Sequence, residues 1–220
     1  MPASFMKMFP QSEQEKIAAA VREAENVTAG EIVPYVVDRS DHYEVAEWRA
    51  GTVAGMAAFV MMTYLRYATG DWSRYDPVMT GAVTLLTGGA AMLAVRFLSP
   101  LMRLFAGRHL MDRRVEQRAA EAFISEEVFA TEKRTGILIF LSILERRVIV
   151  IGDAGIHAKV RQDDWHGIVR LIVDAIRARR PSDGLVEGIR RSGALLAAHG
   201  VTRSPGDRDQ LPDNLRIRQE

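Results

Sequence analysis

Two uncharged stretches of nearly membrane-spanning length lie in the middle of the chain and restrict what it can fold into. Residues 50–65 and residues 77–95 contain no Asp, Glu, Lys or Arg. About 20 apolar residues span a bilayer as a helix. The segment between them, residues 70–76, is short, polar and aromatic, which is typical of a turn in the headgroup layer. We therefore expect a transmembrane helical hairpin over residues 49–98.

Small residues within both stretches favour insertion of the two helices as a pair. Ala, Gly, Thr and Met dilute the strongly apolar residues, so each span alone inserts weakly. Gly51 and Gly55 lie four residues apart in the first stretch, and Gly88 and Gly89 lie in the second. Small residues allow two membrane helices to approach closely. The alternative interpretation is a pair of buried helices in a soluble core.

Arginines around the two stretches predict the orientation in the membrane. Only Arg74 lies within the turn, with Arg66 at its edge, whereas the outer flanks are rich in arginine. These flanking residues are Arg49, Arg96, Arg103, Arg108, Arg113, Arg114 and Arg118. By the positive-inside rule, we expect a multi-pass protein of the cell membrane with both termini and the soluble domain in the cytosol. The first sixteen residues also lack the apolar run of a signal peptide. The run from Arg103 to Arg118 fits this topology and an attraction to anionic headgroups.

The soluble part is predicted to be one α/β domain in two pieces, residues 10–48 and 99–200. Residues 12–15 have the form of a capping box that opens a first helix ending near Asn26. A strand follows over residues 31–37, in which Pro34 favours an edge position or a bulge.

After the hairpin, residues up to about Lys133 continue as a helix with one apolar face, and two apolar strands follow at 137–144 and 147–151. We expect these strands to pair in an antiparallel hairpin. Their near-continuous apolarity requires helices on both faces of the sheet.

The C-terminal part is predicted to supply those helices and then a tail. Apolar residues recur at helical spacing from Trp165 to Ile176, and Pro181 opens a last helix that ends at His199-Gly200. Asp163 and Asp164 are interpreted as capping residues. Residues 201–220 are charged and poor in apolar residues, so we expect a disordered tail.

Four segments, in this order, resemble the TPM domain family: residues 28–33 (TAGEIV), 134–140 (RTGILIF), 145–156 (ERRVIVIGDAGI) and 183–189 (DGLVEGI). The resemblance implies a TPM-like α/β/α sandwich with a central mixed β-sheet. Members of this family have been linked to metal binding, to weak phosphatase activity and, in chloroplasts and cyanobacteria, to photosystem II repair, with no common activity established. Many members carry acidic or Asn residues just before the second strand, where this chain has Lys133, Arg134 and Thr135. That departure removes oxygen ligands that a cation would use.

Asp153 and Glu31 are the candidate metal ligands. Asp153 directly follows a predicted buried strand, at a position where loops of α/β sheets commonly carry sites. Glu31 opens the first strand, and if the strands are neighbours the two carboxylates would suit Ca²⁺ or Mg²⁺. The alternative interpretations are a turn residue bonded to its own backbone for Asp153 and a solvated strand start for Glu31. His157 and His166 lack matching ligands at metal-binding spacing.

Composition and missing motifs exclude several function classes. The formal net charge is +1, so nothing favours nucleic acid as a partner, and the absence of Cys excludes thiolate chemistry. The nucleotide-binding, nucleophile-elbow and zinc-protease motifs are also absent. We therefore predict a membrane-anchored accessory protein that binds a membrane or cytosolic protein partner, or a cation, at the cytosolic face. The alternative is a metal-dependent phosphatase acting on phosphomonoesters, with Asp153 and Glu31 as ligands.

Overall fold

The computed structural model describes residues 8–70, 76–203 and 210–218, and it divides the chain into two compact units. One unit combines residues 1–41 with 112–220, and the other spans residues 42–111. The second unit therefore extends beyond the predicted hairpin, residues 49–98, on both sides. We describe each unit separately.

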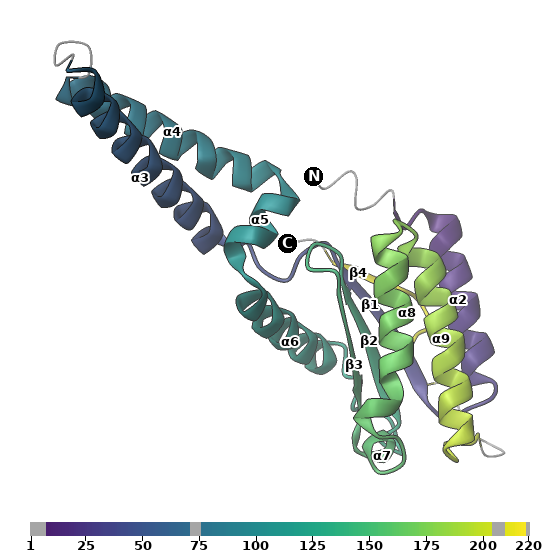
Figure 1. Cartoon of the computed structure of the whole chain (residues 1–220). Helices are drawn as coiled ribbons and strands as arrows, with labels where there is room; N and C mark the ends of the chain where they lie inside the picture. The colour runs from purple at the N-terminus through teal and green to yellow at the C-terminus, as the bar shows by residue number, and fades with distance from the viewer. Residues whose placement is uncertain (1–7, 71–75, 204–209, 219–220) are drawn as a thin grey trace. The chain divides into compact units, whose positions relative to one another are not determined.

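The first unit is built on a four-stranded mixed sheet (Figure 1). Its strand order is β3-β2-β1-β4, in which β1 pairs parallel with β2 and β4 while β2 and β3 are antiparallel. The predicted pairing of the two apolar strands is thus confirmed. The strands are β1 (Glu31–Val37), β2 (Gly136–Ser142), β3 (Arg147–Gly152) and β4 (Arg216–Arg218).

Helices cover both faces of this sheet, as the apolarity of the strands predicts (Figure 1). Alternate residues of β2 point to opposite faces. Ile137 and Ile139 pack with the helices α2 (Gln11–Glu25), α8 (His166–Arg177) and α9 (Pro181–Ala198). Leu138 and Phe140 pack on the other side with apolar residues of α6 (Arg108–Ser125). Every residue of β2 is buried in consequence.

Two local predictions at the start of the domain are wrong. The first helix begins at Gln11 after Pro10, and no side chain caps it, so Ser12 is not the capping residue. Pro34 lies in a strand that pairs on both sides, not at an edge. The proline is tolerated because β4 pairs only with Tyr35, Val36 and Val37, which leaves Pro34 outside that ladder.

The prediction of a disordered tail from residue 201 is also wrong for the residues that the structure describes there. Ile217 of β4 pairs with Val36, and Leu215 is buried. Arg216 and Arg218 both bond the Glu126 carboxylate, and that hydrogen bond raises the pKa of Arg218. Ion pairs and backbone pairing with β1 therefore order a segment that has few apolar residues.

The predicted end of the helix after the hairpin, near Lys133, is wrong as well, because α6 ends at Ser125.

The second unit contains an antiparallel pair of long helices followed by a short one. α3 (Glu44–Thr69) is followed by a left-handed Gly70 at its C-cap. Asp76 caps the start of α4 (Pro77–Phe97), because its carboxylate accepts the Met79 N–H at 2.7 Å. The helices meet at their small residues, because a side chain on Gly88 would lie only 3.1 Å from the Gly51 carbonyl oxygen. α5 (Ser99–Ala106) follows α4 directly and packs on both long helices.

Candidate functional site

Both predicted carboxylates lie at the same end of the sheet, where β1 begins and β3 finishes, but they belong to different strands. Glu31 opens β1, and its N–H donates to the Thr135 carbonyl at 3.1 Å. Asp153 follows β3, and its N–H donates to the Gly136 carbonyl at 2.9 Å. The two carboxylates could share a cation only if β1 and β3 were neighbouring strands. The strand order places β2 between β1 and β3. The structure therefore does not bring Asp153 and Glu31 together.

Asp153 is a buried helix-capping residue paired with an arginine. Its carboxylate accepts the Ala154 N–H at 2.7 Å at the start of α7 (Ala154–His157) and is 5% exposed as a residue. Arg134 approaches both carboxylate oxygens, with Nε 2.6 Å from Oδ2 and Nη2 2.9 Å from Oδ1. The guanidinium thus occupies the side of Asp153 on which a cation would bind.

The loop that carries Arg134 is held against the start of α7 by a glycine. The Gly155 N–H donates to the Arg134 carbonyl at 2.9 Å. A Cβ at Gly155 would lie 2.5 Å from the Lys133 carbonyl oxygen, so no other residue permits this close approach. Arg134 itself has a φ of 55°, in the left-handed region. The backbone on both sides therefore positions the ion pair.

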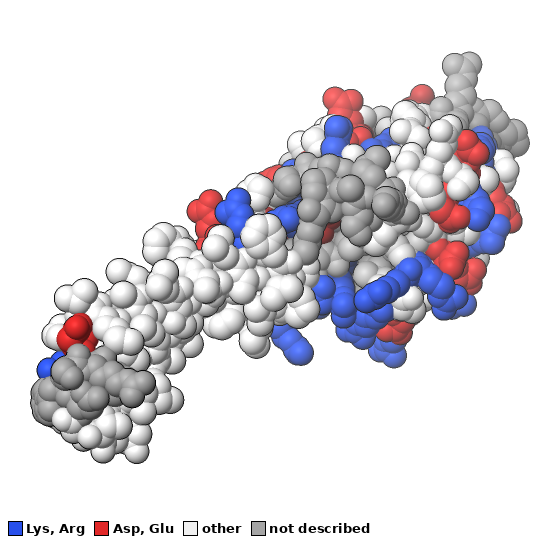
Figure 2. All heavy atoms as spheres, turned by 90° about the horizontal axis from the view of Figure 1, so that it is seen from above, with Lys and Arg blue, Asp and Glu red and all other residues white. Residues whose placement is uncertain are grey.

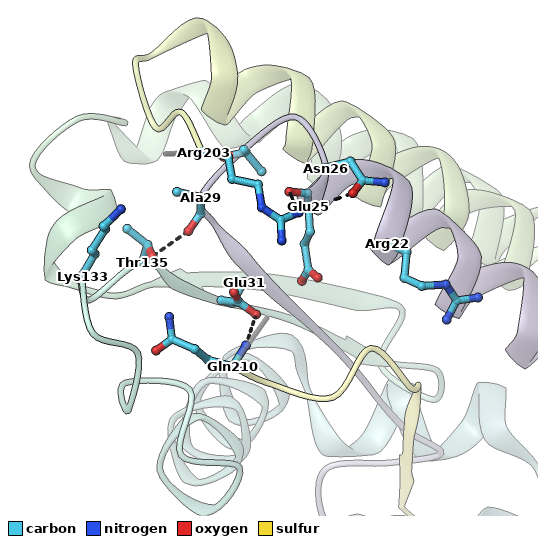
Figure 3. Close-up of a pocket in the computed structure, with 10 residues that line it drawn as sticks. Arg22, Glu25, Asn26, Ala29, Glu31, Lys133, Thr135, Arg203 and Gln210 are labelled. Carbon is cyan, nitrogen blue, oxygen red and sulfur yellow. Dashed lines mark hydrogen bonds between the residues drawn. The ribbon is translucent and has the colours of Figure 1, made fainter. Parts of the chain in front are cut away.

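Glu31 lines a polar pocket at this same end of the sheet (Figure 3). Its residue is 7% exposed, and its carboxylate accepts the backbone N–H groups of Gln210 and Leu211 at 3.3 Å each. The pocket has a volume of about 200 Å³. Sites that enclose small-molecule ligands typically measure about 300–1,000 Å³. This pocket is therefore suited to an ion or a single side chain rather than to a nucleotide or an organic cofactor.

Charges of both signs line the pocket. Glu25 is buried, and its carboxylate accepts the Ile32 N–H at 2.7 Å. Arg203 reaches across it, as Figure 3 shows, to donate to the Glu25 carbonyl and the Asn26 side chain at 3.2 and 3.4 Å. The lining residues are Arg22, Glu25, Asn26, Thr28, Ala29, Glu31, Lys133, Thr135, Arg203 and Gln210. None of these lining residues is a His, Ser or Cys, and its titratable side chains are Arg22, Glu25, Glu31, Lys133 and Arg203.

Metal-ligand clusters are also absent from the described part of the chain. Within residues 8–70, 76–203 and 210–218, no group of three or more His, Asp or Glu side chains is placed to hold an ion. His166 instead contacts the Asp163 carbonyl at 3.0 Å. Asp164 accepts the Arg161 N–H at 2.9 Å within a short 3₁₀ turn (Gln162–Trp165). The prediction that Asp163 and Asp164 cap the following helix is wrong, because α8 begins after Trp165 with no side-chain cap.

A buried polar cluster at the opposite end of the sheet, where β1 and β2 finish, was not expected from the sequence. Glu145, which lies between the two strands predicted at 137–144 and 147–151, is 6% exposed and accepts hydrogen bonds from the Ser142 hydroxyl and from the Ser40 N–H, the latter at 2.9 Å. The Ser40 hydroxyl also bonds that of Ser142 at 2.9 Å. These contacts tie the segment after β1 to the β2–β3 turn. No sequence signal distinguishes Glu145 from an exposed turn residue, because the contact to Ser40 is made across strands.

Comparison with known proteins identifies the fold and no more. No family model matches the sequence, and no curated protein sequence matches it. Among solved structures, the NMR structure of the BA42 protein from the psychrophilic bacterium Bizionia argentinensis is similar, with a TM-score of 0.57 and 19% sequence identity over 94% of each chain. At this identity the likeness supports the α/β architecture with its mixed sheet.

Proposed function

We propose that this protein is a membrane-anchored member of the TPM domain family, in which the α3–α4 hairpin spans the bilayer and the α/β unit binds a protein partner in the cytosol. The observation that carries the anchoring is the exposed apolar surface of the hairpin. An 18-residue stretch of α4 has a mean hydropathy of 1.8, and only 11% of that stretch is buried. Of the helices that the structure describes, it is the one long and apolar enough to cross a membrane by itself.

The exposed apolar side chains of α3 support a second span beside α4. α3 carries exposed Val53, Met56, Phe59, Val60 and Met61, and α4 carries exposed Val78, Leu85, Leu86 and Leu93. Monomeric soluble proteins rarely expose contiguous apolar patches larger than a few hundred Å². A bilayer would cover this surface, whereas the alternative of a buried helix pair in a soluble core is difficult to reconcile with such exposure.

The geometry of the α/β unit favours binding over catalysis. Binding of Ca²⁺ or Mg²⁺ by Asp153 would require Arg134 to leave its carboxylate, and Glu31 lies beyond β2. The same separation gives no support to a phosphatase that holds one metal between these two residues. The mixed charges of the polar pocket instead suit a polar side chain of a partner.

The anchoring and its orientation can be tested with single cysteines, because the chain contains none. We expect the protein to resist carbonate extraction from membranes. Thr69→Cys, at the end of α3 next to the turn, should react with a membrane-impermeant maleimide in intact cells. Glu116→Cys, exposed on α6, should react only after permeabilisation. Release by carbonate would refute the anchoring, and the reverse labelling pattern would refute the orientation.

The partner-binding role has a separate test. Photo-cross-linking from a position on the pocket rim, Lys133, should yield one defined adduct in membranes, whereas the same cross-linker at the exposed Arg170 of α8 should not. Recovery of the bait alone from both positions would count against a partner at this pocket.

A further inference from the structure

One end of the helical hairpin combines arginines with exposed apolar side chains. Because Gly51 packs against Gly88 and Met92, the beginning of α3 lies beside the end of α4. α5 follows α4 without a gap and packs on both helices at this end. We call this region, residues 96–108 together with Arg49, the hairpin base.

Polar contacts hold α5 in place within the hairpin base. The Arg49 guanidinium donates to the Phe105 and Ala106 carbonyls, both at 3.2 Å. These carbonyls belong to the last turn of α5 and would otherwise lack helical partners. Arg96, in the last turn of α4, lies 3.9 Å from Glu47 of α3. The short helix is therefore fixed to the hairpin by its backbone and is not a free linker.

The outer surface of the hairpin base is both apolar and cationic. Met102 and Ala106 of α5 are buried against the hairpin, whereas Leu104 is 71% exposed. Phe97 and Leu98, just before α5, are exposed as well. Arg103, in the last turn of the same helix, is half-buried, and Arg108 is exposed just beyond it. Exposed apolar side chains beside arginines are the pattern of a segment that lies in the headgroup layer of a membrane.

The distribution of charge along the hairpin agrees with this placement. The hairpin face seen in Figure 2 is uncharged along most of its length, with charged side chains at its two ends. The hairpin base carries four arginines, and its end of α3 adds only Glu44 and Glu47. Two further arginines of the longer sequence cluster belong to the α/β unit, where Arg114 bonds Asp41 at 2.8 Å and Arg118 bonds Glu121 at 3.2 Å.

We propose that the hairpin base is a binding surface for anionic phospholipids, with Phe97, Leu98 and Leu104 inserted at the boundary of headgroups and acyl chains. Arg103 and Arg108 contact the lipid phosphates and anionic headgroups, while Arg49 holds α5 in position and Arg96 lies beside Glu47 of α3. This assignment rests on the proposed anchoring, since it requires the hairpin to be in a bilayer. Clusters of basic residues next to a membrane helix bind anionic lipids by this combination of forces.

The test measures which lipids stay bound to the full-length protein. The protein is reconstituted into nanodiscs that contain phosphatidylcholine and phosphatidylglycerol, released into detergent, and its retained lipids are identified by native mass spectrometry. We expect phosphatidylglycerol to be enriched over its share in the nanodisc. Each basic residue near an anionic surface changes the equilibrium by about fivefold. The double variant Arg103→Gln/Arg108→Gln should therefore lower the enrichment by up to about 25-fold.

A matched double variant, Arg170→Gln/Arg177→Gln, removes the same charge from exposed positions of α8 in the α/β unit and should keep the wild-type enrichment. Carbonate extraction of each protein separates the two proposals. If the protein is extracted, the anchoring itself fails. If it stays in the membrane but retains phosphatidylcholine and phosphatidylglycerol in their supplied ratio, or if both double variants behave alike, only the lipid-binding surface is refuted.

Discussion

At the residue scale, the buried Asp153 depends on Arg134 as its counter-charge. The side chain of Asp153 is 6% exposed, while that of Arg134 is 55% exposed. Breaking a fully buried ion pair costs about 3–5 kcal/mol, and exposed pairs contribute about 1 kcal/mol or less. For this half-exposed pair we expect Arg134→Ala to lower the free energy of unfolding by about 1–2 kcal/mol. Thermal unfolding of the detergent-solubilised protein measures the change.

A double-mutant cycle provides the control for that prediction. Asp153→Asn preserves an oxygen that can accept the Ala154 N–H but removes the negative charge. If the ion pair is the cause, the loss caused by Arg134→Ala should shrink markedly in the Asp153→Asn background. Equal losses in both backgrounds would show that another contact of Arg134, such as its guanidinium over the Phe129 ring, dominates the effect rather than the ion pair.

At the scale of elements, the packing of α3 on α4 depends on which glycine of an adjacent pair faces the other helix. A Cβ on Gly88 would lie 3.1 Å from the Gly51 carbonyl, whereas one on Gly89 would meet no atom within 4 Å. We expect Gly88→Val to separate the helices and Gly89→Val to leave them in contact.

The cysteine-free chain allows a direct measurement of that separation. Gly55 and Thr84 face each other across the helix pair, with an added Cβ at Gly55 lying 3.6 Å from the Thr84 methyl. Cysteines introduced at both positions should form a disulfide on mild oxidation, detected by loss of maleimide reactivity. The yield should fall with Gly88→Val and persist with Gly89→Val. The same yield in both variants would contradict the helix interface.

The strand β4 is the element whose contribution is least evident from its residues. Leu215 is 6% exposed, and burying an apolar side chain of this size contributes about 1.5–3 kcal/mol. A chain that ends after residue 209 should therefore be at least about 2 kcal/mol less stable and should exchange the amides of β1 faster. A chain that ends after Arg218 keeps β4 and is the control. Unchanged exchange in the shorter chain would refute a structural role for β4.

The elements that the sequence predicts well are those whose own apolar pattern decides their structure. The burial of Ile137, Leu138 and Ile139 on alternating faces of the sheet follows directly from an apolar run of strand length. β4 has only three residues, Arg216, Ile217 and Arg218, so its pairing depends on partners in β1 and on Glu126. The metal-site hypothesis for Asp153 and Glu31 depended on strand order, and local pattern does not determine strand order.

At the scale of the whole molecule, the hairpin is an insertion within a domain that is continuous in space. Asp41 lies just before the second unit and Asp112 just after it. Asp41 bonds Arg114 at 2.8 Å, and Asp112 bonds Arg147 of β3. Both ends of the interruption are therefore held on the α/β unit by contacts within that unit. Its two apolar cores, one on each face of the sheet, contain none of the hairpin residues that the structure describes.

The α/β unit should consequently fold after residues 42–111 are replaced by a Gly/Ser linker of about six residues, which spans roughly 13 Å as a flexible chain. We expect the shortened protein to remain soluble without detergent. Its midpoint of thermal unfolding should lie within about 4 °C of that of the α/β unit in the full chain, the shift that about 1 kcal/mol produces in a domain of this size. A full chain with the same linker inserted after Asp41 shows whether the linker itself disturbs the domain. A shortened protein that aggregates or lacks a cooperative transition, while this control folds, would mean that the hairpin is needed to complete the domain rather than to anchor it.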